Sequence, residues 1–225
     1  MGRVYGRSDL EEVAAWCEER RLHLVWDEVY ALSVFGDRPF VSGGSLRPAL
    51  GPRAHLVWAF SKDFAASGLR CGVLVSENED VLRTVDGLAY WSCCSGDTQA
   101  LLEQMLADEH WVERYLREMR ARLGAAYREV VGALAREGIP FLPGGAGFFV
   151  LVDVRRYLPE TTWEEEQRLW SRLLTEGNVN LTPGSACRLG EPGFLRLCFA
   201  GQPAETVAEG VRRLGEVVSR ARRGR

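Results

Sequence analysis

The sequence HLVWAFSKDFAASGLRCG, residues 55–72, decides the fold, because it joins an apolar strand to a polar turn. Residues 55–59 form an apolar run of strand length, and Ser61 and Lys62 follow directly after it. The chain has 28 basic residues, and Lys62 is its only lysine. An ε-amino group can lose its proton and form a Schiff base with a carbonyl, whereas a guanidinium keeps its charge. Either Lys62 is the only lysine by chance, or its amine has a covalent role. We predict the covalent role.

The composition is typical of a globular protein long enough to form a core. The 225 residues are 46% hydrophobic and 26% charged, with a net charge of −3. This balance is too acidic for a nucleic-acid-binding protein and too polar for a membrane protein. The six cysteines show no CxxC spacing, and the chain has three histidines, so we expect a reduced protein without a metal site. The opening MGRVYGRSDL shows no apolar signal segment, so we expect a cytoplasmic protein.

Helices and strands alternate in the first half, a pattern that predicts an α/β fold. Ser8 and Glu11 match a capping box, which predicts a helix over 8–21. In open α/β sheets, ligands bind at the carboxyl ends of strands, and both Asp27 and Lys62 stand at such ends. We therefore expect these two side chains to line one crevice. The strands predicted here cover residues 22–26, 55–59 and 71–76.

The second half is richer in helix, and we place a domain boundary where this change begins. Apolar residues recur at helical spacing after Asp97, and Thr162 with Glu165 matches a second capping box. The predicted domains are residues 1–100 and 101–225. The elements predicted after the boundary are a helical region over 97–138, a hairpin-like turn at 143–147, a strand over 148–153, a helix over 162–176, a strand over 194–200 and a helix from about 203.

The polar residues around Lys62 match the requirements of pyridoxal phosphate. A carboxylate such as Asp27 can keep a pyridinium nitrogen protonated, and the Tyr30 hydroxyl can donate a hydrogen bond to the ring oxygen. Arg70 can hold a phosphate with its planar fork of donors. Each also has a structural alternative: a loop cap, a packing aromatic and a surface charge. A nucleotide hydrolase is the rival interpretation of Asp27, but the sequence has no GxxxxGK[ST] loop.

Three segments of the chain resemble motifs of the class I/II aminotransferases, which are fold type I pyridoxal-phosphate enzymes. They are DEVY at 27–30, SKDFAASGLRCG at 61–72 and TPGSACRLGEPGFLRLCFA at 182–200. Within that superfamily, the SKD, GLR, PGS and EPGFLRLCFA segments look like those of 1-aminocyclopropane-1-carboxylate synthase and its animal synthase-like relatives. The likeness covers nearly the whole chain.

The resemblance implies an aminotransferase-like α/β fold, in which the C-terminal part of a large mixed-sheet domain is followed by a smaller α/β domain. It implies a homodimeric, pyridoxal-phosphate-dependent enzyme acting on an α-amino acid, either by transamination or as a lyase. Lys62 would form the Schiff base and act as the catalytic base, and Arg196 would bind the substrate carboxylate. The residues implied to bind pyridoxal 5'-phosphate are Asp27, Tyr30, Ser61, Lys62 and Arg70.

The sequence also departs from the family pattern. Its opening aligns with the glycine end of an Asn-Pro-x-Gly motif, so we expect that roughly the first half of a typical member is missing. That half holds a phosphate-binding loop and an aromatic that stacks on the cofactor ring. Position 59 is alanine where many aminotransferases have a phosphate-binding serine. The alternative function is therefore that of a truncated, catalytically inactive or partner-binding fragment.

Overall fold

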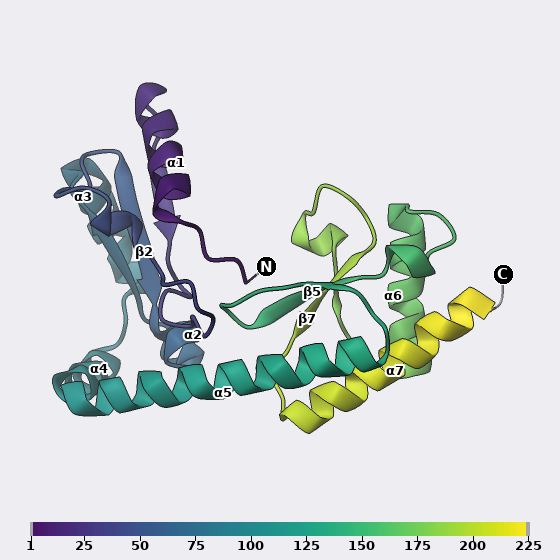
Figure 1. Cartoon of the computed structure of the whole chain (residues 1–225). Coiled ribbons are helices and arrows are strands. Elements are labelled where there is room, and N and C mark those ends of the chain that lie inside the picture. The colour runs from purple at the N-terminus through teal and green to yellow at the C-terminus, as the bar shows by residue number, and fades with distance from the viewer. Residues whose placement is uncertain (1, 224–225) are drawn as a thin grey trace. The chain divides into compact units, whose positions relative to one another are not determined.

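The computed structural model describes residues 2–223 and divides the chain into two compact units (Figure 1). The first unit is Val4–Arg120, and the second combines Met1–Arg3 with Ala121–Arg225. The division falls within helix α5 (Glu109–Arg136). The predicted domain boundary at residue 100 stays a prediction. Within residues 2–223, no helix combines the length and the apolar character needed to span a membrane.

The first unit is built on a three-stranded sheet in the order β1-β2-β3. These strands are β1 (Leu24–Asp27), β2 (Ala54–Ala59) and β3 (Gly72–Ser76), close to the predicted ranges. Strands β1 and β2 are parallel, with Asp27 opposite Val57, and β3 is antiparallel to β2. Because β1 and β2 run parallel, their carboxyl ends lie at the same edge of the sheet, which is where ligands gather in α/β proteins.

The helices of the first unit differ from the prediction at two places. Helix α1 (Arg7–Glu19) begins after Gly6, whose backbone N–H donates to Asp9 Oδ2 at 2.9 Å. The predicted capping box of Ser8 and Glu11 was wrong, because Ser8 already lies inside the helix. Helix α3 (Glu79–Ser92) was not predicted at all, although Asn78 caps it by accepting two backbone hydrogen bonds.

The helical region predicted over 97–138 forms two helices, α4 (Gly96–Ala107) and α5. They are separated at Asp108, whose carboxylate accepts the Trp111 backbone N–H at 2.9 Å and so caps the start of α5. The short helix α2 (Phe60–Asp63) and the 3₁₀ turns η1 (Gly43–Ser45) and η2 (Ser67–Leu69) complete the first unit.

The core of the first unit lies beneath the turn that follows β2. Phe60, Phe64 and Leu102 are buried there, and Tyr115 of α5 stacks on Phe64 with ring centroids 5.3 Å apart. Trp58 meets Phe60 edge to face at 4.7 Å. Aromatic pairs in these arrangements stabilise the fold beyond the burial of their area. Because Phe60 precedes Lys62 and Phe64 follows it, this packing holds the turn that carries Lys62.

The second unit is a four-stranded antiparallel sheet in the order β4-β5-β7-β6. Its central strands β5 (Phe149–Asp153) and β7 (Phe194–Cys198) hold fully buried side chains such as Val152 and Leu195. The edge strands are β4 (Phe141–Leu142) and β6 (Thr182–Pro183). Residues 143–147 join two antiparallel strands, so the predicted hairpin-like turn is confirmed.

Helices α6 (Trp163–Gly177) and α7 (Ala204–Arg223) lie side by side in the second unit (Figure 1). Leu173 of α6 and Leu214 of α7 are completely buried. The Thr162 hydroxyl caps α6 by accepting the Glu165 backbone N–H at 3.3 Å, so the predicted cap is confirmed. The 3₁₀ turns η3 (Arg155–Tyr157) and η4 (Ser185–Cys187) complete the unit.

Candidate active site

Lys62 lies in the short helix α2, directly after strand β2, and its side chain is half-buried. Its Nζ atom is 5.9 Å from the centroid of the Tyr30 ring. Tyr30 follows β1, the strand parallel to β2, so the sheet register brings these two segments together. An ammonium at this distance from a phenol ring is attracted by the ring's electrons. The structure therefore places two of the predicted cofactor residues side by side.

Asp27 and Glu28 have different surroundings at the end of β1. Asp27 is exposed, and its Oδ1 accepts the Val29 backbone N–H at 3.3 Å. Glu28 is half-buried and accepts hydrogen bonds from Ser42 Oγ at 2.9 Å and from the Gly43 backbone at 2.7 Å. Burial raises the pKa of Glu28, although both hydrogen bonds oppose the shift. Glu28 therefore anchors a loop, and Asp27 is the carboxylate that faces outward.

Ser61 and Arg70 supply donors on either side of Lys62 in sequence. Ser61 is half-buried and precedes Lys62 in α2. Arg70 is exposed and follows η2, and its Nη1 donates to the Ser67 carbonyl oxygen at 2.8 Å. Arg70 has φ +51°, a left-handed conformation that is unusual for a residue with a side chain. The hydroxyl and the guanidinium are groups that bind phosphate.

The set of side chains fits pyridoxal phosphate in its chemistry. The first unit holds one amine, an outward-facing carboxylate, a phenol, a hydroxyl and a guanidinium, and the amine lies against the phenol ring. Position 59 contributes no hydroxyl, because Ala59 occupies it at the end of β2. The residues present therefore have the functional groups that covalent, ring and phosphate contacts would need, without a hydroxyl at position 59.

Asp63 is a buried acid beside Lys62 that the sequence analysis missed. Its side chain is 0% exposed. Its carboxylate accepts hydrogen bonds from Ser33 Oγ at 2.5 Å, Trp58 Nε1 at 2.9 Å and the Leu32 backbone at 3.1 Å. Asp63 directly follows Lys62 in the sequence, but no local pattern there indicates its donors at Leu32 and Ser33. Asp63 joins the turn after β1 to the turn after β2, and so holds the segments of Tyr30 and Lys62 together.

Arg196, the predicted carboxylate-binding residue, lies on β7 in the second unit. Its Cζ is 4.5 Å from the Phe149 ring centroid, and its Nη2 donates to Thr182 Oγ1 at 3.4 Å. Its buried Nε has no hydrogen-bond partner within the described residues. A guanidinium held in place with an unused donor is suited to bind a carboxylate.

Glu166 of α6 organises the loop that leads into β7, and the sequence analysis missed it too. Its carboxylate is fully buried and accepts backbone hydrogen bonds from Gly193 at 2.7 Å, Ser185 at 3.1 Å and Phe194 at 3.3 Å. Gly193 has φ +95°, and an added Cβ would collide with Arg155, so only glycine fits there. This loop fixes the start of the strand that carries Arg196.

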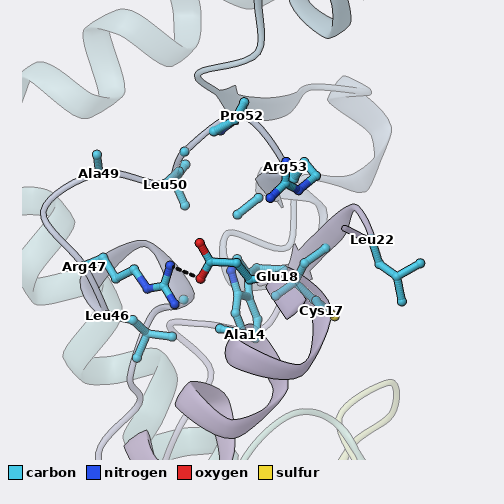
Figure 2. A pocket seen from close by; sticks show the side chains of 15 residues that line it. Ala14, Cys17, Glu18, Leu22, Leu46, Arg47, Ala49, Leu50, Pro52 and Arg53 are labelled. Carbon is cyan, nitrogen blue, oxygen red and sulfur yellow. Dashed lines mark ion pairs between the residues drawn. The ribbon is translucent and has the colours of Figure 1, made fainter. Parts of the chain in front are cut away.

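A hollow of about 160 Å³ lies elsewhere in the first unit, between α1 and the loop before β2 (Figure 2). Its walls include Leu24, Trp26 and Leu50, and an ion pair of 2.6 Å joins Glu18 to Arg47 beside it (Figure 2). None of the six predicted site residues lines this hollow. It is therefore separate from the candidate active site.

Three polar side chains form a hydrogen-bonded row across the first sheet. His23 Nδ1 is 2.9 Å from His55 Nε2, and His55 Nδ1 is 2.8 Å from Ser76 Oγ. His55 is buried, and burial together with the nearby His23 lowers its pKa below the ordinary 6.5. No group of three or more His, Cys, Asp or Glu side chains in residues 2–223 could hold a metal ion.

Comparison with known proteins identifies the family. Residues 1–214 match the family described as aminotransferase class I and II, so the chain belongs to that family. It is 42% identical over 222 residues to human 1-aminocyclopropane-1-carboxylate synthase-like protein 1, covering 97% of this chain and 44% of that protein. It is 34% identical over 228 residues to 1-aminocyclopropane-1-carboxylate synthase 7 of Arabidopsis thaliana, covering 99% of this chain and 51% of the plant protein.

Solved structures agree with this assignment. An aromatic aminotransferase from Pyrococcus horikoshii matches with a TM-score of 0.86 and 27% identity, over 97% of this chain and 57% of that one. An aspartate aminotransferase from Thermotoga maritima matches with a TM-score of 0.81 and 27% identity, over 97% and 54%. The predicted aminotransferase-like α/β fold is confirmed. The chain spans about half the length of the relatives that it matches.

Proposed function

We propose that this chain belongs to a pyridoxal-phosphate-dependent enzyme that acts on an α-amino acid and is anchored to its cofactor at Lys62. The observation that carries the proposal is the position of the single lysine. It follows the carboxyl end of β2, with its amine against the Tyr30 ring and with Asp27 ending the parallel strand β1. Family membership supports the choice of cofactor.

Each side chain of the first unit has a separate task in this proposal. Pyridoxal phosphate, when bound, supplies an electron sink for the charge left on an amino acid that loses its α-proton. Lys62 holds the cofactor's aldehyde through its amine and, once released, takes the α-proton as a general base. Asp27 keeps a proton on the ring nitrogen, and Tyr30 donates to the ring oxygen. Ser61 and Arg70 bind the phosphate.

Arg196 is assigned to the substrate carboxylate in the same proposal. The contacts with Phe149 and Thr182 orient its guanidinium, and the buried Nε has a donor to spare within the described residues. A planar guanidinium can bind a carboxylate through two parallel hydrogen bonds, which a lysine cannot do. The substrate class that follows is an α-amino acid.

The reaction type follows from the fate of the proton and the substrate side chain. A substrate that gave up its amino group would leave as a keto acid by transamination, and a substrate with a γ leaving group, such as S-adenosylmethionine, would lose that group and close to a cyclopropane. Relatives named as 1-aminocyclopropane-1-carboxylate synthases support the lyase. Solved aminotransferases support transamination. Incubation with each candidate substrate, followed by chromatography for a keto acid or a cyclic amino acid, decides between them.

The test of the anchor uses the chain itself. The protein is incubated with pyridoxal phosphate, reduced with borohydride and cleaved after arginine. We expect the added mass on the peptide 54–70, which contains Lys62. The N-terminal amine is an internal control, because it is the only other amine of this chain. An unlabelled peptide 54–70, or equal cofactor binding by the variant Lys62→Arg, would overturn the proposal.

The proposal includes a homodimer and a cytoplasmic location. The dimer is what the resemblance to the family implies, and sedimentation of the cofactor-loaded protein tests it. All six cysteines are free thiols, which supports a reducing compartment such as the cytoplasm.

A noncatalytic, partner-binding protein is the second candidate function. The observation in its favour is the apolar surface of the first unit, where Tyr90 and Trp91 are 82% and 83% exposed. Large exposed apolar groups mark surfaces that other chains cover. Failure of the borohydride test together with recovery of a stoichiometric complex would favour this candidate.

A further inference from the structure

The hollow between α1 and the loop before β2 combines apolar walls with charged side chains (Figure 2). Its volume of about 160 Å³ is close to the roughly 150 Å³ of an apolar cavity that holds a benzene molecule. The large apolar side chains of its walls include Leu22, Leu24, Trp26, Leu46 and Leu50. The space therefore fits one small ring or one short aliphatic chain.

The walls of the hollow are held in place by hydrogen bonds of the loop backbone. The Glu77 carboxylate accepts the backbone N–H groups of Leu50 at 3.0 Å and Gly51 at 2.8 Å. The Leu24 backbone N–H of β1 donates to the Arg53 carbonyl oxygen at 2.8 Å. Ligand sites are usually formed in advance in this way, so binding would not have to order the loop.

Arg53 gives the hollow an excess positive charge. The other two charged residues of the lining, Glu18 and Arg47, form an ion pair of 2.6 Å and offset each other. The buried Nε of Arg53 has no hydrogen-bond partner within the described residues. A buried donor without an acceptor is costly, and a guanidinium can bind a carboxylate through two parallel hydrogen bonds. The lining is therefore complementary to one negative charge on an apolar body.

We propose that this hollow is a binding site for a small apolar monocarboxylate, an acid that carries one ring or a short aliphatic chain. Its carboxylate pairs with the Arg53 guanidinium, and its apolar part lies against Trp26 and the neighbouring leucines. A neutral ring would leave Arg53 without an acceptor, and a phosphate would leave the apolar walls in contact with water. The site is separate from Lys62 and does not rest on the proposed cofactor.

A ligand in the hollow would touch both parallel strands of the first sheet. Trp26 lies in β1, one residue before Asp27, and Ala54 is the first residue of β2. A ligand that binds only the folded state shifts the equilibrium away from the unfolded chain. Binding should therefore stabilise the first unit against heat.

Benzoate is the probe, and the test uses the full chain without any cofactor. Isothermal titration calorimetry should give a dissociation constant of about 1 mM or lower, within the range that the best and the ordinary contacts of so small a ligand allow. The melting temperature should rise with the benzoate concentration. Benzamide has the same ring without the charge, and we expect it to bind at least tenfold more weakly. Inorganic phosphate should not displace benzoate.

Matched variants locate the bound probe. Arg53→Gln should weaken benzoate binding at least tenfold. Ala14→Leu extends a side chain into the hollow and should abolish binding, whereas Ala15→Leu, at an exposed position of the same helix, should leave it unchanged. Arg196→Gln is a second control, because benzoate bound at the predicted carboxylate-binding arginine would be lost in that variant alone.

The ligand-free variant Arg53→Leu separates binding from folding. Because it removes a buried donor without an acceptor, its melting temperature should equal or exceed that of the parent. A clearly lower melting temperature would show that Arg53 serves the fold and would overturn its assignment to a ligand. The proposal would also be wrong if benzoate gave no saturable heat, if benzamide bound equally well, or if Arg53→Gln or Ala14→Leu kept the parent's affinity. Loss of binding in Arg196→Gln would overturn it as well.

Discussion

The carboxylate of Asp63 accepts hydrogen bonds from two segments of the first unit, the turn after β1 and strand β2. Ser33, one of its donors, is also completely buried. A buried carboxyl group of this kind is stable only while its hydrogen bonds are made. The position of Lys62 relative to Tyr30 therefore depends on the hydrogen bonds of Asp63.

We predict that Asp63→Ala strongly destabilises the protein. One buried donor, Ser33, and two part-buried donors, Leu32 and Trp58, would lose their acceptor, and a buried unsatisfied group costs roughly 1–3 kcal/mol, so we expect a loss of about 2 kcal/mol or more in the free energy of unfolding. Urea titration followed by tryptophan fluorescence measures it. Asp86→Asn, at an exposed position of α3, is the control and should change the free energy by less than about 0.5 kcal/mol. A loss below 1 kcal/mol for Asp63→Ala would contradict the buried network.

The sequence predicts the positions of candidate residues best where one rule of topology applies. The ends of two adjacent apolar strands pointed to Asp27 and Lys62, and the parallel pairing of those strands makes their ends meet. Asp63 and Glu166 were missed because their roles come from burial and from backbone donors far away in sequence. Such donors become neighbours only after the tertiary fold is formed, and no local pattern records them.

At the scale of elements, the row of His23, His55 and Ser76 joins the residue before β1 to strands β2 and β3. We predict that this sheet loses stability in mild acid. The folded state holds the pKa of His55 below 6.5, so the unfolded chain binds the proton more readily. The free energy of unfolding should fall as the pH drops from about 7 to about 5, and level off below the folded pKa.

His55→Gln isolates this effect, because glutamine keeps a hydrogen-bonding side chain but does not titrate. Urea midpoints of parent and variant are compared at each pH. As the pH falls through 6.5, we expect the free energy of unfolding of the parent to decrease more than that of the variant. Parallel pH profiles for both proteins would show that His55 does not contribute to the acid response.

Helix α6 offers a separate prediction in the second unit. The Thr162 hydroxyl accepts the Glu165 backbone N–H, which otherwise has no partner within the helix. Thr162→Ala should therefore lower the free energy of unfolding by about 1 kcal/mol. Thr161→Ala is the matched control, since Thr161 is exposed and precedes the cap. Equal losses in both variants would mean that the cap contributes nothing.

Caps and strand patterns predicted most elements, and the errors have clear physical causes. At α1, Ser8 and Glu11 had the right spacing, but Gly6 and Asp9 had the same spacing two residues earlier and formed the cap. The apolar residues of helix α3, among them Val81, Val85 and Leu88, do recur at helical spacing after the cap residue Asn78, so the sequence carried the signal and the prediction overlooked it.

At the scale of the whole molecule, the two units differ in how well they cover their apolar side chains. Fifteen of the seventeen exposed large apolar side chains found within the described residues belong to the first unit, and only Leu142 and Trp163 belong to the second. The exposed side chains include Val25 on β1 and Val75 on β3. We expect the isolated chain to aggregate or to require a partner, and a monodisperse, cooperatively unfolding monomer would contradict this.

Replacement of Tyr90 and Trp91 by serine tests the same surface more narrowly. Both rings are more than four-fifths exposed, so the double variant should be more soluble and bind less of a hydrophobic dye. Its free energy of unfolding should change by less than about 0.5 kcal/mol. Trp163→Ser, at a 37% exposed position in the second unit, is the control and should affect solubility less. Unchanged solubility of the double variant would show that Tyr90 and Trp91 do not cause the aggregation.

The single lysine has a practical consequence for handling the protein. A protease specific for lysine has one cleavage site in this chain and yields the fragments 1–62 and 63–225. Any group attached to the Lys62 amine blocks that cut. Resistance to the protease therefore reports, on an ordinary denaturing gel, what fraction of the molecules carries a modified Lys62.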